Sequence, residues 1–332
     1  MLGWHVMTLA GFPVDHVTRA LGDPAVASVE VVERFTASAA EVGKSATGSG
    51  LAAARCERRF FEHIAPLWDH PAPGLLGAHE ADDGDRARLL LLTEDLGAAG
   101  YALATAASVT QLHAVVDTLV GFHARFWNDL PFDRLGAAEP SLGQSARAWP
   151  AGAIAGHAIA ARDAAAHFAD AGVLTADERA VLDHVLASWE ARFVDRARAG
   201  QALTLIHGDF HLLGNVLFTA NDPRLRVIDW SELKPGLGPH DLAYCLAGVP
   251  ADDRPARDGA LLRRYWHGLG AAGVTDYSWA LCEWDYRFSL VTNLFQSVFQ
   301  GSTFWFRRTA QLIRELNGFA ALDSPPPLPR YA

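Results

Sequence analysis

The sequence predicts an α+β fold in which a small mixed lobe is followed by a larger, mainly helical lobe. The chain has 332 residues, which is long enough for two lobes or domains. Before residue 97 it holds short apolar or β-branched runs that are typical of strands, whereas later segments place apolar residues at three- and four-residue spacing, as helices do. We therefore expect an N-terminal lobe over residues 1–97 and a C-terminal lobe over residues 98–332.

The composition is that of a globular protein, with 50% hydrophobic and 20% charged residues. No apolar run reaches the ~20 residues that span a membrane, and the first residues do not resemble a signal peptide. The cysteines Cys56, Cys245 and Cys282 are scattered and lack metal-ligand spacing, so we expect a reduced, cytoplasmic protein. A net charge of −10 disfavours nucleic acid as a partner. The sequence does not indicate an oligomeric state.

The expected elements of the first lobe follow from local patterns, and the long leucine run near residue 90 predicts a buried strand. In chain order we expect a helix at 14–21, a strand at 27–35, a flexible loop at 36–50, a helix at 51–67 and a strand at 88–93. The loop contains Gly43-Lys44-Ser45, but it is not a phosphate loop, because Ser38 stands where the first glycine is required.

The second lobe is expected to hold six long helices, one of them opened by a capping box of Thr175 and Glu178. Their expected ranges are 108–127, 151–171, 175–199, 258–271, 277–299 and 303–319. His123 lies on the apolar face of the first of these helices, and we interpret it as a packing or polar-network histidine.

Residues 203–246 interrupt the helices with a different pattern. Apolar runs broken by Asn-Asp-Pro predict a short hairpin, which would bring Asp209, Asn215 and Asp229 to one end of a small sheet. Oxygen ligands of this kind suit Mg²⁺ with phosphates attached. In phosphoryl transfer one Asp orients the attacking hydroxyl while an Asn and a second Asp hold the metal. The alternative is a buried hairpin whose turns happen to carry these residues.

The motif His207-Gly208-Asp209-Phe210-His211, followed by Asn215, Ile228-Asp229-Trp230 and Gly-Pro-His-Asp-Leu-Ala-Tyr at 238–244, resembles a known family. It is similar to the aminoglycoside phosphotransferase and choline kinase superfamily, which has the protein-kinase-like fold, and within it to the ecdysteroid-kinase-like branch. The resemblance implies transfer of the γ-phosphate of ATP, with Mg²⁺, to a hydroxyl of a small molecule.

The resemblance also implies a role for each motif residue. Asp209 would be the catalytic base, Asn215 and Asp229 the metal ligands, and His207 and Asp241 supports of the catalytic loop. The family usually places the Asn five residues after the Asp, whereas here the two are six apart.

The nucleotide-binding part departs further from the family pattern. Glu57 stands where kinase-like folds place a helix glutamate that pairs with a strand lysine, although a solvated helix face would explain it equally well. The expected strand supplies Arg34 instead of lysine, while Lys44 lies in the expected loop, and no glycine-rich hairpin precedes them. By the resemblance, the backbone of Glu94, Asp95 and Leu96 would meet the adenine edge.

The acceptor side is less defined by sequence. His211, Trp230, Glu232 and Asp285 are candidates for contacts with the acceptor, and aromatic residues of the late helices could form an apolar pocket or simply core. Two other functions stay open: a catalytically impaired kinase-like protein that acts as a binding or scaffold module, and a metal-assisted phosphate hydrolase. The sequence names no acceptor and does not decide between ATP and GTP.

Overall fold

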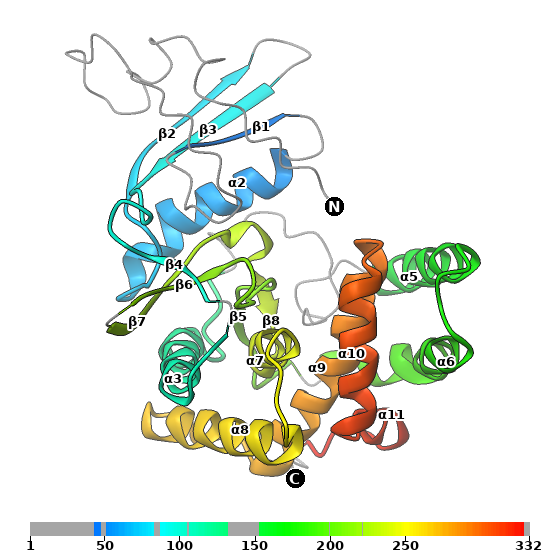
Figure 1. Cartoon of the computed structure of the whole chain (residues 1–332). Coiled ribbons are helices and arrows are strands. Elements are labelled where there is room, and N and C mark those ends of the chain that lie inside the picture. Colours follow the sequence, from blue (N-terminus) through cyan, green and yellow to red (C-terminus); the bar gives the residue numbers. More distant parts are fainter. Residues whose placement is uncertain are drawn as a thin grey trace, which may run out of the picture. The chain divides into compact units, whose positions relative to one another are not determined.

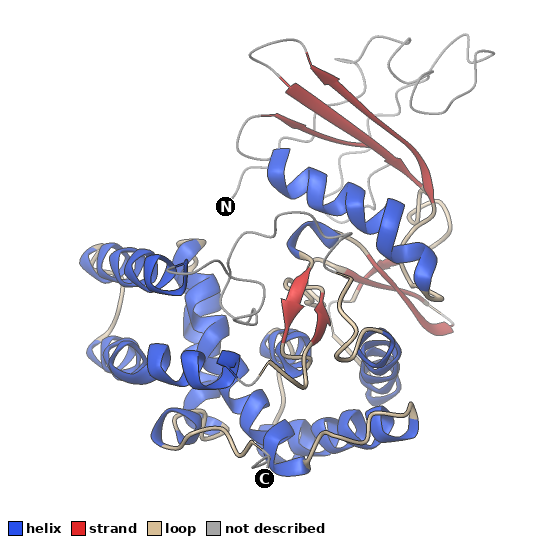
Figure 2. Ribbon diagram, turned by 180° about the vertical axis from the view of Figure 1, so that it is seen from behind, coloured by secondary structure: helices blue, strands red, loops and turns tan. Residues whose placement is uncertain are grey.

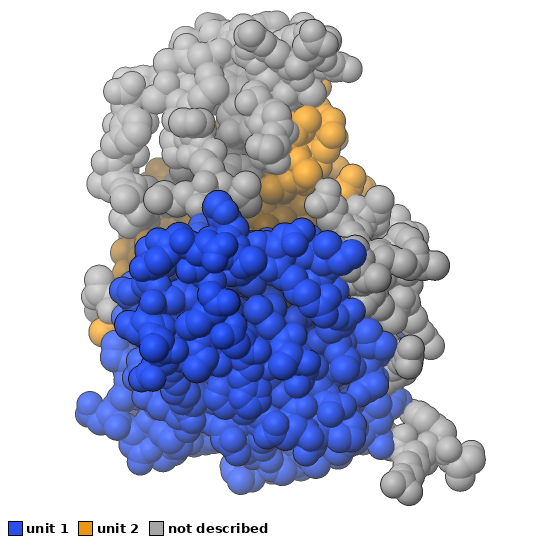
Figure 3. Space-filling view, turned by 90° about the vertical axis from the view of Figure 1, so that its right-hand side faces the viewer, with its two compact units in different colours: residues 1, 107–211, 234–332 blue, residues 2–106, 212–233 orange. Residues whose placement is uncertain are grey.

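The computed structural model describes residues 43–47, 51–82, 87–104, 106–131, 153–198, 200–220 and 222–328. The chain divides into two compact units, coloured separately in Figure 3. The unit coloured orange in Figure 3, called the first unit below because its residues come first in the chain, comprises residues 2–106 and 212–233. The unit coloured blue, called the second unit below, comprises residues 107–211 and 234–332 together with residue 1. The helix expected at 14–21 and the strand expected at 27–35, with Arg34, lie outside the described residues. The lobe boundary expected after residue 97 stays a prediction.

The first unit contains an antiparallel sheet whose middle strand is the predicted leucine run. Its order is β1 (Gly43–Thr47), β3 (Ala87–Thr93), β2 (Leu75–Asp82). Helix α2 (Leu51–Arg59) packs on this sheet (Figure 1), burying its own Leu51 and Ala54 against Leu89 and Leu91. The helical segment continues without a break through Phe60–Ile64 and Ala65–Leu67, so the helix expected at 51–67 is confirmed.

Strand β1 corrects the expectation of a flexible loop over residues 36–50. Lys44 lies opposite Leu91 of β3 in a regular antiparallel register that runs the whole length of β1. The sequence of β1, Gly-Lys-Ser-Ala-Thr, has low intrinsic strand preference, but pairing with a buried neighbour overrides such preferences. Strand β2 was not predicted for a similar reason, since Leu-Leu-Gly-Ala-His-Glu-Ala-Asp lacks β-branched residues.

The predicted hairpin is confirmed as strands β6 (Val216–Thr219) and β7 (Asp222–Val227), which pair in a sheet of order β4-β6-β7 with β4 (Ala102–Leu103). Pro223 lies in β7, an edge strand, where a missing amide is tolerated. The apolar run at 203–206 does not join this sheet. It forms β5 (Thr204–Ile206), which pairs with β8 (Lys234–Gly236) in the other unit.

The second unit is mainly helical (Figure 2). Its helices are α3 (Val109–Arg125), α5 (Ala153–Asp170), α6 (Ala176–Arg198), α7 (Pro239–Ala247), α8 (Arg254–Ala271), α9 (Trp279–Phe299), α10 (Thr303–Glu315) and α11 (Ala320–Asp323). The predicted capping box is present, because the Thr175 amide donates to Glu178 and the Glu178 amide donates to the Thr175 hydroxyl. Helix α9 is buried along most of its length and contacts α5, α7, α8, α10 and α11. Among the helices that are described, none has the length and apolar character needed to cross a membrane.

Candidate active site

The loop that follows strand β5 is held through its backbone by Asp241, in the first turn of α7. One carboxylate oxygen of Asp241 accepts a hydrogen bond from the His207 amide at 2.8 Å, and the other accepts from the Gly208 amide at 3.0 Å. Gly208 has a φ of 84°, which glycine adopts without a steric penalty. These are the contacts that the sequence resemblance implies for Asp241.

Asp241 belongs to a buried polar chain that crosses three helices. His123 of α3 lies with Nε2 at 3.3 Å from Asp241 and Nδ1 at 2.8 Å from the hydroxyl of Tyr265 on α8. Burial raises the pKa of Tyr265 well above its usual value, so this hydroxyl stays protonated and can donate a hydrogen bond to Nδ1. Burial alone would raise the pKa of Asp241, but this pKa is lowered because the hydrogen bond from His123 and the neighbouring histidines favour the ionised carboxylate. The interpretation of His123 as a polar-network histidine is confirmed.

The carboxylate of Asp209 lies in this same unit, where Gln296 and His211 are among its neighbours. Its Oδ1 accepts a hydrogen bond from Nε2 of Gln296 on α9 at 3.0 Å, and its Oδ2 lies 3.7 Å from Nε2 of His211. The Asp209 amide donates to Nδ1 of His207, which is fully buried. Gln296 was not predicted, because it lies 87 residues from Asp209 and no local motif marks it.

Asn215 and Asp229 lie at one end of the β6–β7 hairpin, in the other unit. Asn215 directly precedes β6, and the amide of Ile228 donates to the Asn215 carbonyl at 3.0 Å, which places Asp229 next to this pairing. Asp229 has a φ of 63°, a left-handed conformation that is uncommon for residues other than glycine. An amide and a carboxylate offer the hard oxygen ligands that Mg²⁺ prefers. In the described part of the chain, no group of three or more His, Cys, Asp or Glu side chains forms an all-protein metal cluster.

Two residues of the first unit are candidates for contacts with a nucleotide. Lys44 lies on strand β1, which leads to α2, and Glu57 of α2 is 3% exposed. Glu57 is therefore a buried residue and not part of a solvated helix face. Lys44 could have been singled out from the sequence because lysine is rare in it: Lys44 and Lys234 are the only lysines of the chain.

The segment after β3 turns sharply through hydrogen bonds of its own. The Glu94 amide donates to the Gly74 carbonyl at 2.9 Å, while the Leu96 carbonyl accepts from the Tyr101 amide at 2.9 Å. The side chain of Asp95 accepts from the Ala98 amide at 3.0 Å. The amide of Glu94 and the carbonyl of Leu96 are therefore already hydrogen-bonded within the protein.

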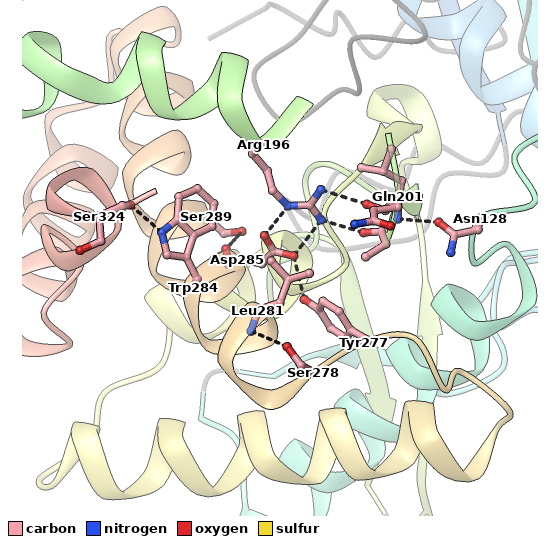
Figure 4. A network of polar contacts seen from close by, with 12 residues as sticks. Asn128, Arg196, Gln201, Tyr277, Ser278, Leu281, Trp284, Asp285, Ser289 and Ser324 are labelled. Atoms are coloured by element: carbon pink, nitrogen blue, oxygen red, sulfur yellow. Dashed lines mark hydrogen bonds and ion pairs between the residues drawn. The ribbon is translucent and has the colours of Figure 1, made fainter. Parts of the chain in front are cut away.

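Two residues expected at the acceptor side have structural roles instead. Trp230 is 1% exposed, and its ring stacks on Phe60 of the first unit with centroids 3.9 Å apart. Asp285 is 0% exposed, pairs with Arg196 and accepts from the Tyr277 hydroxyl (Figure 4). Their burial removes both from contact with a substrate. Glu232 is half-buried, in the short helix Trp230–Glu232.

His211, a further candidate for contact with the acceptor, lies beside Asp209 and is partly exposed. Its side chain is 15% exposed, and its ring lies 5.7 Å from that of Tyr244 and 5.3 Å from that of Trp305. Trp305 in turn neighbours the ring of Phe304, which is 49% exposed. Aromatic side chains of α7 and α10 therefore surround the histidine that faces Asp209.

Comparison with known proteins identifies the fold. A point mutant of aminoglycoside 2'-phosphotransferase IIIa in complex with GDP has a TM-score of 0.52 at 14% identity, covering 92% of this chain and 97% of that chain. A choline/ethanolamine kinase family protein from Mesorhizobium loti has a TM-score of 0.50 at 12% identity, covering 90% and 94%. Among curated proteins none matches. The two structures confirm the predicted α+β, protein-kinase-like fold class.

A match to a protein-family model shows which family this sequence belongs to. The model of the phosphotransferase enzyme family that includes the aminoglycoside phosphotransferases matches residues 34–279. This range contains Lys44, Glu57, Asp209, Asn215 and Asp229. The narrower ecdysteroid-kinase-like assignment stays a prediction. Because the match extends over most of its length, the chain belongs to the phosphotransferase enzyme family.

Proposed function

We propose that this protein transfers the γ-phosphate of ATP to a hydroxyl group of a small molecule with the help of Mg²⁺. The observation that carries the proposal is the ordered catalytic loop, in which Asp241 fixes the His207 and Gly208 amides and Asp209 follows directly. Family membership supports the reaction class. In this proposal Asp209 orients the acceptor hydroxyl and receives its proton.

Asn215 and Asp229 are the proposed metal ligands. Their amide and carboxylate oxygens fit Mg²⁺, which leaves its other positions to water and phosphate oxygens. The bound ion would neutralise charge that develops on the phosphates. The chain itself contributes the hairpin, whose Ile228–Asn215 backbone bond keeps the two ligands at one end.

The nucleotide contacts are proposed for the first unit. Adenine presents a donor and an acceptor along one edge, and the carbonyl of Glu94 with the amide of Leu96 would form a matching pair, while Asp95 shapes the turn between them. Lys44 replaces Arg34 as the proposed strand lysine, because β1 pairs with β3 and precedes the helix that carries Glu57. A lysine at this position would bind phosphate oxygens and pair with Glu57.

The acceptor contacts are proposed for His211, whose ring lies among aromatic side chains and faces Asp209. Glu232 stays a further candidate. Because one structural neighbour is a GDP complex, GTP is tested beside ATP.

A thermal-shift titration with ATP or GTP, with and without Mg²⁺, tests the proposal directly. Stabilisation that requires the metal is expected for the native chain and follows mass action. Asp229→Asn should lose the metal-dependent shift, whereas Asp209→Asn should keep the shift and lose phosphoryl transfer in an acceptor screen. Full transfer by Asp209→Asn would refute the assignment. Metal-dependent binding without transfer to any acceptor would favour the binding-module alternative, and phosphate release alone would favour hydrolysis.

A further inference from the structure

The base proposed above has a partner from a distant helix that the family motif does not contain. Nε2 of Gln296 donates to Oδ1 of Asp209 at 3.0 Å. Gln296 lies near the C-terminal end of α9, within the same compact unit as Asp209. The helix is firmly anchored, since it is buried along most of its length and its residue Asp285 is bound to Arg196. A donor on such a helix has a fixed position.

The two oxygens of Asp209 are in different surroundings. Oδ1 receives a directed hydrogen bond from Gln296, whereas Oδ2 lies 3.7 Å from His211 Nε2, beyond hydrogen-bond distance. The χ2 torsion of aspartate has a broad distribution, so packing alone defines the plane of the carboxylate poorly. A directed donor on Oδ1 therefore helps to define this plane.

The type of donor also matters. A cationic partner would strongly favour the ionised carboxylate and weaken it as a base, whereas an amide stabilises the charge less. Gln296 has a neutral amide, so it can fix the orientation of Asp209 and leave it able to accept a proton.

We propose that Gln296 is a positioning residue that holds Oδ1 of Asp209 and so orients this carboxylate toward the acceptor hydroxyl. The inference rests on the proposed function. As the hydroxyl oxygen bonds to the γ-phosphorus, its proton passes to the Asp209 carboxylate. The bond between the γ-phosphorus and the bridging oxygen then breaks, and its electron pair leaves with the nucleoside diphosphate.

The test compares Gln296→Met, which keeps the side-chain length and removes the donor, with Gln311→Met as a matched control. Gln311 lies exposed on α10 and donates to Glu315 at 2.6 Å. In the full chain labelled with ¹³C at the aspartate carboxyl carbons, the Asp209 signal is identified by its loss in Asp209→Asn. Its titration is then followed without any ligand. Slow turnover of MgATP with water as acceptor supplies the kinetic measurement.

We expect the Asp209 titration to move to higher pH by roughly one unit in Gln296→Met, because a hydrogen bond to the charged form is lost. We expect kcat for MgATP turnover to fall by about 10- to 100-fold, with KM for ATP within about twofold, because orientation and not nucleotide binding is impaired. Gln311→Met should change neither quantity.

The outcomes separate the inference from the proposed function. An unchanged Asp209 titration, or an unchanged kcat in Gln296→Met, would overturn the role of Gln296 even if turnover depends on Asp209. Full turnover by Asp209→Asn would instead overturn the proposed function. A parallel loss of kcat and of thermal stability, without a shift of the Asp209 titration, would show that Gln296 only supports the fold. A native chain that turns over MgATP neither with water nor with any acceptor of the screen would contradict both.

Discussion

Replacing Arg196 by Met should destabilise the second unit more than any surface change, because its guanidinium is buried in a dense set of hydrogen bonds. Nε and Nη2 bind the two oxygens of Asp285 at 2.7 and 3.0 Å, and Nη1 and Nη2 bind the carbonyls of Gln201 and Ala202 at 2.9 and 3.0 Å (Figure 4). The pKa of Arg196 is raised, because the charge and hydrogen bonds of Asp285 outweigh burial. The pair is therefore charged in the native chain.

The magnitude follows from what each substitution leaves behind. Arg196→Met leaves the Asp285 carboxylate buried with Tyr277 as its remaining donor, which should cost about 3–5 kcal/mol. Asp285→Leu leaves a buried guanidinium with two carbonyls and should cost a similar amount. In the double variant no charge remains. Three polar groups then lose a partner, namely the carbonyls of Gln201 and Ala202 and the Tyr277 hydroxyl, at about 1–3 kcal/mol for each group that stays buried without a new partner. The loss in the double variant should thus be smaller than the sum of the two single losses.

Urea unfolding, followed by tryptophan fluorescence, measures these differences in the free energy of unfolding. A loss of about 3–5 kcal/mol is a large part of the ~5–15 kcal/mol that stabilises a typical protein. Additive losses in the double variant would refute the reasoning, because they would show that the two side chains do not depend on each other. A loss below about 1 kcal/mol in Arg196→Met would contradict the buried ion pair itself.

Three further changes have defined outcomes. Gly238→Ala should destabilise the chain, because its Cβ would clash with the Tyr265 hydroxyl, and adding Tyr265→Phe should recover part of the loss in thermal denaturation. Burial lowers the pKa of His240 to about 4 from 6.5, although Asp241 opposes this. The neutral form is thus the native one, and stability should fall by roughly 3 kcal/mol as the pH drops from about 6.5 to about 4, a slope that His240→Phe should remove in urea titrations. Asn293→Leu should raise the melting temperature, because this 1% exposed amide has no hydrogen-bond partner among the described residues, and a lower melting temperature would show that the amide is paired.

The sequence predicted those elements whose cause is local. The leucine run of β3, the capping box of α6 and the turn residues of the β6–β7 hairpin all act within a few residues of one another. Strand β1 could not be predicted in this way, because its strand state comes from pairing with β3 and not from its own residues. The prediction that Lys44 lies in a loop was wrong for the same reason, since Lys44 belongs to β1.

The same distinction applies to the site. The motif residues Asp209, Asn215 and Asp229 could be named from spacing alone, as could the support by Asp241 through the resemblance. Gln296 could not, because its contact with Asp209 joins residues 87 positions apart. The buried ion pair of Asp285 could not be predicted either, because its partner Arg196 lies 89 residues away. The local sequence around Asp285 would be the same for an exposed acid.

The extra residue between Asp209 and Asn215 need not disturb the base. The backbone of the loop is held at His207 and Gly208 by Asp241, and the carboxylate of Asp209 is held by Gln296, so every one of these contacts lies before the insertion or outside it. The following turn belongs to the other compact unit, which begins again at residue 212, and its Leu213 is 38% exposed. A turn with an exposed side chain accommodates one more residue at low cost. The longer spacing therefore changes how the chain reaches its proposed metal ligand, whereas the contacts of the loop and of Asp209 with helices α7 and α9 do not depend on it.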